Sequence, residues 1–413
     1  MSVWRIIGII AIFGITSIGW LILGGVTSMR SHDTGRNLEG EIHQLWGRMQ
    51  TQQAPRFIDY REEIRRSTRD GVAYEETHFE PQTHRPDRTR VDVALDLDAR
   101  RKGLMWYSLY DVKLDGEWRY THRGPAGALD VVFTFPDPAG VYDGFHFIVD
   151  GIDRTGELQP QNGQVTLRMQ VAEGQQVTLA ARYQSRGLES WRYQPADGVN
   201  RLEDFALTLT TDFTDIDYPY ETLSPSSRER TADGWRLGWQ FEQVVTGHGI
   251  GMVMPAKVQP GELATELSVS APVSLLFFFL VLFVLDRLRD IGMHPINYLF
   301  LAGAFFAFHL LFAYSVDHLP VEAAFALASV VSLFLVVTYL RLVVGNRFAF
   351  VEAAAAQLVY LVGFSLAHFW AGYTGLTITV LSILTLFLLM QWTGRVDWSE
   401  ALRRRPRLAE NPA

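Results

Sequence analysis

Six polar side chains lie within or beside the long apolar stretches in the last third of the 413-residue sequence. They are His309, Asp317, His318, Glu352, Gln357 and His368. A charged side chain at the centre of a lipid bilayer costs at least about 2.5 kcal/mol, so each such residue requires a structural or functional reason. We take these six as the candidate functional residues of the apolar region, inside a membrane or at its edge.

The three histidines and Asp317 have two interpretations. Three imidazoles and one carboxylate could form a metal or proton site. No short ligand spacing brings the four together, however, and a histidine near the end of a span commonly hydrogen-bonds a neighbouring helix. We therefore predict no metal site and no cofactor.

Two further features of these stretches have structural explanations. Glu352 lies about one turn into its stretch, where we expect it to reach the membrane interface or to pair with Arg341 or Arg347. His294 and Pro295 precede another stretch, and proline suits the first turn of a helix because its missing N–H is not needed there. We expect both features to stabilise helices, and a proton or substrate site at Glu352 is the alternative.

The composition excludes several classes of protein. The formal net charge of -8 argues against a nucleic-acid partner, which requires a basic face. Cysteine is absent, so disulfides, thiolate metal sites and thiol nucleophiles are excluded. The sequence contains no nucleophile elbow, metalloprotease helix, phosphate loop or calcium-loop spacing. We predict that the protein is not an enzyme, and an enzyme acting on peptidoglycan or lipid is the alternative.

Apolar stretches of spanning length must position the candidate residues. Residues 4–26 are long enough to cross a hydrocarbon core of about 30 Å, and they exceed the apolar region of a cleaved signal peptide. We predict an uncleaved anchor helix there. Five further runs are residues 272–285, 296–316, 321–340, 348–370 and 376–392, the first extended back toward residue 267. The sequence thus predicts six membrane-spanning helices.

The distribution of arginine predicts the orientation of these helices. Arg289, Arg341 and Arg395 fall on one side of a model of successive helical hairpins, whereas the opposite turns, 317–320 and 371–375, contain no Lys or Arg. Basic residues are retained on the cytoplasmic side. We predict a multi-pass protein of the bacterial cytoplasmic (inner) membrane, with cytoplasmic N and C termini and residues 28–266 in the periplasm.

The middle of the chain has the alternating pattern of β-strands. Residues 91–98 alternate most clearly between apolar and polar, and similar short segments recur up to residue 244. Asp-Gly at 115–116 and at 150–151, and Asn-Gly at 162–163, fit hairpin turns because glycine accepts a positive φ. Many short strands with such punctuation predict an antiparallel β-sandwich-like domain.

The predicted fold class is therefore a membrane α-helical bundle plus an all-β extracytoplasmic domain. It comprises an N-terminal transmembrane anchor, an antiparallel β-sandwich-like domain and five C-terminal transmembrane helices. The predicted divisions are 1–27 for the anchor, 28–70 for a juxtamembrane helix and linker, 71–266 for the periplasmic β-rich domain, 267–398 for the five-helix bundle and 399–413 for a cytoplasmic basic tail.

Four stretches, in the same order along the chain, resemble the CreD family of bacterial inner-membrane proteins. They are residues 41–55, 100–118, 293–318 and 394–398. The most specific is 293–318, which begins with a His-Pro-x-x-Tyr motif. The residues that match the family motifs are Trp46, Gly47, Gly116, His294, Pro295, Tyr298, Asp397 and Trp398. Residues 187–195 depart from the family, whose Trp-x-x-Pro-Ser-Phe-like signature is not recognisable there.

The resemblance implies a non-enzymatic envelope protein, in some bacteria expressed under a two-component regulatory system and linked to tolerance of colicins and envelope stress. It carries over no catalytic residue. We predict a contribution to cell-envelope integrity or stress response, in which the β-domain binds a protein or envelope-component partner and the helices contact the lipid bilayer. The oligomeric state is left open.

Two other functions are consistent with parts of the sequence. A transporter, or a subunit accessory to one, would place His309, Glu352, Gln357 and His368 along a polar path through the C-terminal helices. A sensor would require a cytoplasmic effector region, but only a short basic tail follows Trp398. The transporter is therefore the main alternative.

Overall fold

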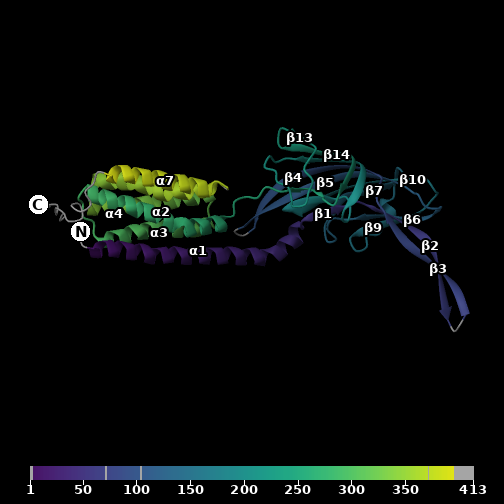
Figure 1. Ribbon diagram of the computed structural model, residues 1–413, viewed down its shortest axis with the longest axis horizontal. Helices are drawn as coiled ribbons and strands as arrows, with labels where there is room; N and C mark the ends of the chain where they lie inside the picture. The colour runs from purple at the N-terminus through teal and green to yellow at the C-terminus, as the bar shows by residue number, and fades with distance from the viewer. Residues whose placement is uncertain (1–2, 70–71, 103–104, 371, 395–413) are drawn as a thin grey trace. The chain divides into compact units, whose positions relative to one another are not determined.

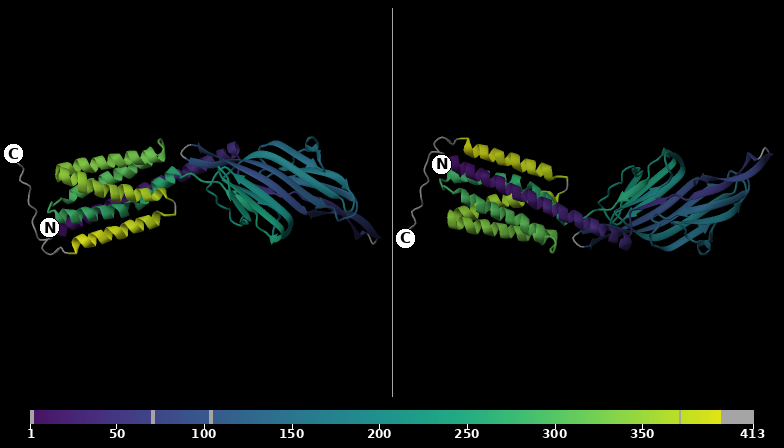
Figure 2. Two further views of the ribbon diagram at one scale, coloured as in Figure 1. Left: turned by 90° about the horizontal axis from the view of Figure 1, so that it is seen from above. Right: turned by 90° about the horizontal axis from the view of Figure 1, so that it is seen from below.

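The computed structural model describes residues 3–69, 72–102, 105–370 and 372–394. The described residues within 1–36, 103–105 and 258–413 form one compact unit, and those within 37–102 and 106–257 form the other (Figures 1 and 2). The first unit is helical and the second is built from strands. The β-rich domain and the six apolar helices, one N-terminal and five C-terminal, confirm the predicted fold class.

Six helices in the described part of the chain are long and apolar enough to cross a membrane. The helices are α1 (Val3–Trp46), α2 (Pro260–Leu288), α3 (Pro295–Ser315), α4 (Val321–Val343), α7 (Thr374–Thr393) and a composite span over Phe348–Phe369. The composite span consists of η2 (Phe348–Ala353), α5 (Ala354–Gln357), η3 (Leu358–Gly363), α6 (Phe364–Leu366) and η4 (Ala367–Phe369). Because η2 and η3 have π-helical turns, α5 lies between two irregular segments of the kind that often marks a functional position.

Helix α1 packs along both α2 and α3 in the helical unit. A Cβ added at Gly24 would lie 2.9 Å from Cγ2 of Val269 on α2, and one at Gly8 would lie 3.3 Å from Cβ of Pro295 on α3. Small residues permit such close approach between helices in a membrane. Trp20 of α1 is fully buried, and its ring meets that of Phe306 edge to face at 5.4 Å.

Two predicted boundaries differ from the observed elements. Helix α2 begins at Pro260, not near residue 267, and Leu263, Leu267 and Ala271 are buried at the four-residue spacing of one helix face. The predicted linker before residue 71 contains β1 (Gln50–Gln53) and β2 (Arg56–Arg69).

The β-domain contains three sheets. The eight-stranded sheet has the order β13-β14-β12-β4-β5-β10-β7-β8, the four-stranded sheet β3-β2-β6-β9 and the three-stranded sheet β1-β11-β15. The remaining strands are β3 (Val72–His84), β4 (Arg88–Lys102), β5 (Met105–Thr121), β6 (Gly127–Thr134), β7 (Tyr142–Val149), β8 (Ile152–Asp153), β9 (Gln164–Val171), β10 (Gln176–Leu188), β11 (Ser190–Gln194), β12 (Asn200–Thr211), β13 (Ser227–Arg230), β14 (Trp235–Thr246) and β15 (Ile250–Val253). Most pairs are antiparallel, but β4–β12 and β1–β11 are parallel, which the sequence did not indicate.

One apolar core is shared by the three sheets. Alternate residues of most strands enter it, as the two-residue period of a strand requires, whereas β8 and β13 are exposed. Fully buried members from the three sheets include Leu95, Trp118, Phe133, Leu207, Trp191 and Met252. The other residues of the eight-stranded sheet face outward, where charged and polar side chains accumulate.

Strands β2 and β3 form a long ribbon that extends beyond the other strands (Figure 1). Near the root of this ribbon, Asp130 of β6 accepts hydrogen bonds from Nε and Nη2 of Arg168, both at 2.7 Å, and from the Tyr60 hydroxyl, also at 2.7 Å. The Arg168 guanidinium lowers the pKa of Asp130 below its usual range. This cluster links β2 to β6 and β9.

Two of the three predicted turns are confirmed and one is wrong. Asp-Gly at 150–151 and Asn-Gly at 162–163 have positive φ at both residues and reverse the chain. Gly116 instead lies inside β5 opposite Ala181, and its φ is not positive. A Cβ at Gly116 would lie 2.1 Å from Cη2 of Trp118, so this glycine makes room for a buried indole.

We expect Gly116→Ala to lower the free energy of unfolding by about 1–3 kcal/mol, because Trp118 is buried and cannot move aside without disturbing the core. Gly156→Ala is the control, since a Cβ there meets nothing within 4 Å; it should change the free energy by less than about 0.5 kcal/mol. Unfolding of the full chain in detergent, followed by tryptophan fluorescence, measures both. Equal effects of the two substitutions would contradict this packing role.

Candidate functional site

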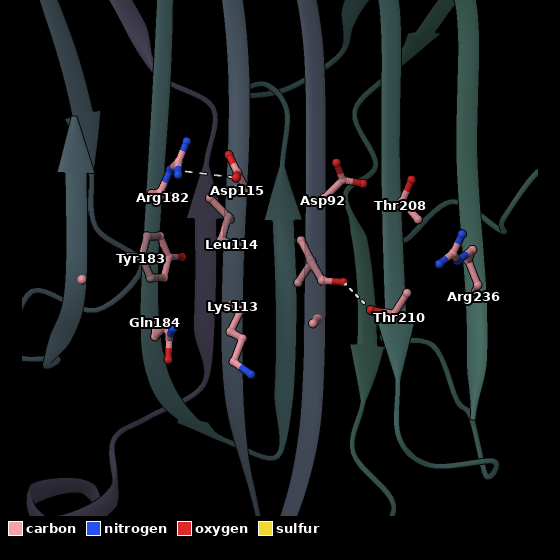
Figure 3. A pocket seen from close by; sticks show the side chains of 13 residues that line it. Asp92, Lys113, Leu114, Asp115, Arg182, Tyr183, Gln184, Thr208, Thr210 and Arg236 are labelled. Atoms are coloured by element: carbon pink, nitrogen blue, oxygen red, sulfur yellow. Dashed lines mark hydrogen bonds and ion pairs between the residues drawn. The ribbon is translucent and has the colours of Figure 1, made fainter. Parts of the chain in front are cut away.

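The outward face of the eight-stranded sheet has a hollow of about 530 Å³ (Figure 3). Strands β4, β5, β10, β12 and β14 form most of its floor. The polar side chains that line it include Asp92, Lys113, Asp115, Arg182, Thr208 and Arg236. A hollow of this volume is within the range of ligand-binding pockets. We call it the sheet groove.

Strand register places residues from distant parts of the sequence next to one another in the sheet groove. Arg182 of β10 lies opposite Asp115 of β5, and Asp92 of β4 lies opposite Thr208 of β12. Figure 3 shows these four side chains in one row across the sheet. The row carries a positive charge, two negative charges and a hydroxyl group.

Several side chains of the sheet groove retain unused hydrogen-bonding capacity. Asp92, Gln184, Thr208 and Arg236 have no side-chain hydrogen bond or ion pair to any other residue that the structure describes. Arg182 and Asp115 are 3.9 Å apart, and both are exposed. Exposed pairs at this distance contribute little, so their charges stay available to a ligand.

A second hollow of about 570 Å³ continues the sheet groove, with Lys113 and Gln184 common to both. Trp46 and Gly47 line it. The Trp46 ring is 6.2 Å from the Tyr107 ring, and Gly47 has φ +94°. A Cβ at Gly47 would lie 2.7 Å from the carbonyl oxygen of Arg186, so only glycine fits the turn that ends α1.

In the helical unit, Gln357 joins three spans through one chain of hydrogen bonds. Its Nε2 donates to Oγ of Ser332 on α4 at 2.8 Å, and Ser332 donates to the carbonyl oxygen of Ala304 on α3 at 2.7 Å. Gln357 and Ser332 are fully buried, and Oε1 of Gln357 has no partner among the described residues. This chain of hydrogen bonds connects the three spans, and Oε1 of Gln357 remains available as a buried acceptor.

The three predicted histidines and Asp317 occupy different surroundings. His309 is buried, with Nδ1 3.0 Å from the Phe305 carbonyl oxygen. Asp317 pairs with Arg30 at 3.1 Å, His318 is exposed and His368 is in η4. Across the described ranges, no group of three or more His, Asp or Glu residues is arranged to hold a metal ion.

Glu352 has a different partner from the two arginines expected. It pairs with Arg289, at the end of α2, instead of Arg341 or Arg347. Arg289 is distant in sequence, and the packing of the composite span against α2 brings the two together. This pair stabilises the contact between the two helices.

The sequence model of the family described as inner membrane protein CreD matches residues 270–399. The match therefore begins within α2 and does not include α1. The resemblance noted in the sequence is thereby confirmed over these residues, and the match and the six apolar helices identify a multi-pass membrane protein in contact with the lipid bilayer.

Known proteins add little to the family match. No curated protein matches the chain. A crystal structure from Legionella pneumophila, described as that of a nutrient-binding protein, is 10% identical and has a TM-score of 0.29 over 59% of this chain and 96% of that one. This likeness is too weak to bear on fold or function.

The CreD-like His-Pro-x-x-Tyr motif forms the start of α3. His294 caps the helix by accepting a hydrogen bond from the Ile296 N–H at 3.2 Å, and Pro295 occupies the first turn. Tyr298 is fully buried, with its ring 5.2 Å from that of Phe279. These residues of the motif thus start the helix and pack it against α2. Asp397 and Trp398 lie outside the described residues.

Sequence reasoning missed the buried carboxylate before this motif. Asp286 is fully buried at the end of α2 and accepts hydrogen bonds from the Met293 N–H at 2.8 Å and from the Arg287 guanidinium. In the sequence Asp286 belongs to a charged flank after an apolar run, which ordinarily lies in solvent. Arg287 follows Asp286 directly in the sequence, and nothing in that pair of residues indicates that both side chains are buried.

We expect Asp286→Asn to lower the free energy of unfolding by about 3 kcal/mol, because it leaves the buried Arg287 guanidinium without a counter-charge. Asp290→Asn is the matched control. Asp290 has φ +50°, which asparagine tolerates, so it should unfold like the wild type. Thermal unfolding of the detergent-solubilised full chain compares them, and coincident curves would exclude the proposed role of Asp286.

Proposed function

We propose that this CreD-like protein contributes to cell-envelope integrity by binding a protein or envelope component through the sheet groove. In this proposal the helices hold the protein in the inner membrane, and the β-domain lies in the periplasm. The proposal assigns no catalytic step to the protein. Its main support is the set of unpaired polar side chains, Asp92, Thr208 and Arg236, on the floor of a pocket-sized hollow.

The contacts within the helical unit support the proposed orientation. The proposal places Arg30 of α1 on the periplasmic side, against the rule that arginine stays on the cytoplasmic side, but Arg30 pairs with Asp317 and donates to the Ala313 carbonyl oxygen at 2.8 Å. Its charge is thus compensated. The other end of the bundle carries Arg289, Arg341 and Arg347, which fits a cytoplasmic face.

The chemistry of the sheet groove favours a ligand with both donors and acceptors. Asp92 accepts, Arg236 donates, and the Thr208 hydroxyl does both. Charges of both signs lie across one row of strands, so a ligand of a single charge would leave part of the surface unmatched. An extended peptide segment of an envelope protein has the required alternation of donors and acceptors.

The proposal predicts that binding depends on the sheet groove. We expect a photo-reactive residue at Thr208 to capture a partner in living cells, and one at Glu173, in an exposed turn, not to capture it. The double variant Asp92→Ala/Arg236→Ala should abolish capture and reduce survival under envelope stress at least tenfold. The control Arg154→Ala/Glu157→Ala removes an exposed ion pair of the same net charge and should preserve both.

The same survival measurement separates binding from transport. Gln357 is a fully buried polar residue of the bundle with an open acceptor, so a transport role along a polar path predicts that Gln357→Leu abolishes survival. Binding through the sheet groove predicts that this variant, if it reaches wild-type levels in the membrane, survives like the wild type. Loss of survival in Gln357→Leu with full survival of the groove variant would refute the proposal.

A further inference from the structure

A third hollow, separate from the sheet groove and from the hollow that continues it, lies at the root of the β2–β3 ribbon. Its volume is about 600 Å³, and its walls come from the end of β1, the start of β2, the end of β3 and the segments that follow β5 and β11. The charged and titratable residues that line it are Arg56, His84, Arg85, Arg123 and Asp197. We call it the basic cavity.

The basic cavity has an excess of positive charge. Three arginines and one aspartate leave two net positive charges with His84 neutral. Arg123 pairs with Asp87 at 2.8 Å, outside the cavity lining, and His84 lies 3.0 Å from Asp59. Arg123 and His84 therefore each have a carboxylate partner of their own. Arg56 and Arg85 are the remaining basic residues of the lining.

Neither Arg56 nor Arg85 has a carboxylate partner among the described residues. Arg56 donates from Nη2 to Oε1 of Gln164 at 3.2 Å, and its Nε is buried without a partner. Arg85 donates from Nη2 to the Asp197 carbonyl oxygen at 3.1 Å. Both guanidiniums thus keep their full charge and most of their N–H donors for a bound anion.

The backbone around these arginines is held in place by the sheets. The Ala54 N–H donates to the Gln194 carbonyl oxygen at 3.0 Å, which joins the segment before β2 to the end of β11. Nδ2 of Asn200 donates at 2.8 Å to the same Asp197 carbonyl oxygen that Arg85 contacts. A preorganised wall of this kind lowers the cost of binding a ligand.

We propose that the basic cavity binds the phosphate group of an anionic ligand. A phosphomonoester carries close to two negative charges at neutral pH, which is one for each of the two guanidiniums without a carboxylate partner, Arg56 and Arg85. Guanidinium groups bind such oxyanions through paired N–H donors. The volume also leaves room for a group attached to the phosphate, such as a sugar or a glycerol unit. This site shares no residue with the sheet groove and is independent of the proposed function.

Calorimetric titration of the full chain in detergent, with inorganic phosphate and glycerol 3-phosphate as probes, tests the proposal. We expect both probes to bind, and Arg56→Gln and Arg85→Gln each to weaken binding at least tenfold. Arg154→Gln is the matched control, because Arg154 pairs with Glu157 and is not among the residues that line the cavity; it should leave binding unchanged. Binding should also weaken as the salt concentration rises.

A short-chain phosphatidic acid distinguishes the source of the phosphate. Tighter binding than glycerol 3-phosphate identifies a lipid headgroup as the ligand, and equal binding identifies a soluble phosphate; both support the phosphate site. If a glutamine variant misfolds, Arg85→Lys keeps the charge and tests the loss of paired donors. Absence of binding by the wild type at millimolar probe, or binding that the variants leave unchanged, would overturn the proposal.

Discussion

The inability of lipid to hydrogen-bond a peptide group is the constraint on which the helical unit depends. Every backbone N–H and C=O within the hydrocarbon must find a partner in its own span, so each long apolar stretch becomes a helix. Side-chain hydroxyls follow the same constraint: Thr27 donates to the Leu23 carbonyl oxygen and Ser268 to that of Ala264, each one turn back. The few polar groups that bond between helices, above all Gln357 with Ser332, therefore fix how the spans pack.

In the β-domain, water can hydrogen-bond polar groups that lipid cannot. The strands of this domain satisfy their backbone groups by pairing, and one face of most strands enters a common core while the other face can carry charge. The outer row of Arg182, Asp115 and Asp92 exists because a wet sheet face tolerates charged side chains that a bilayer would exclude. Because of this difference in solvent, the proposal assigns anchoring to the helical unit and binding to the β-domain.

Apolar length and strand alternation predicted the spans and most of the strands, because both are local properties of the sequence. The turn predicted at Gly116 was wrong because this glycine leaves space for the Trp118 ring in the folded core. The Asp-Gly dipeptide alone does not reveal that contact. The Arg289–Glu352 pair and the buried Asp286 depend on helix packing. The sheet groove and the basic cavity combine residues from several strands, so the register had to be known before either could be recognised.

The transmembrane arrangement is the claim on which the rest depends, and cysteine labelling tests it most directly because the native chain contains no cysteine. In intact spheroplasts, a membrane-impermeant maleimide should label Gly156→Cys in the β-domain and His318→Cys in the turn after α3. It should label Asn346→Cys, between α4 and η2, only when the membrane is opened. Labelling of Asn346→Cys in intact spheroplasts, with Gly156→Cys protected, would contradict the account.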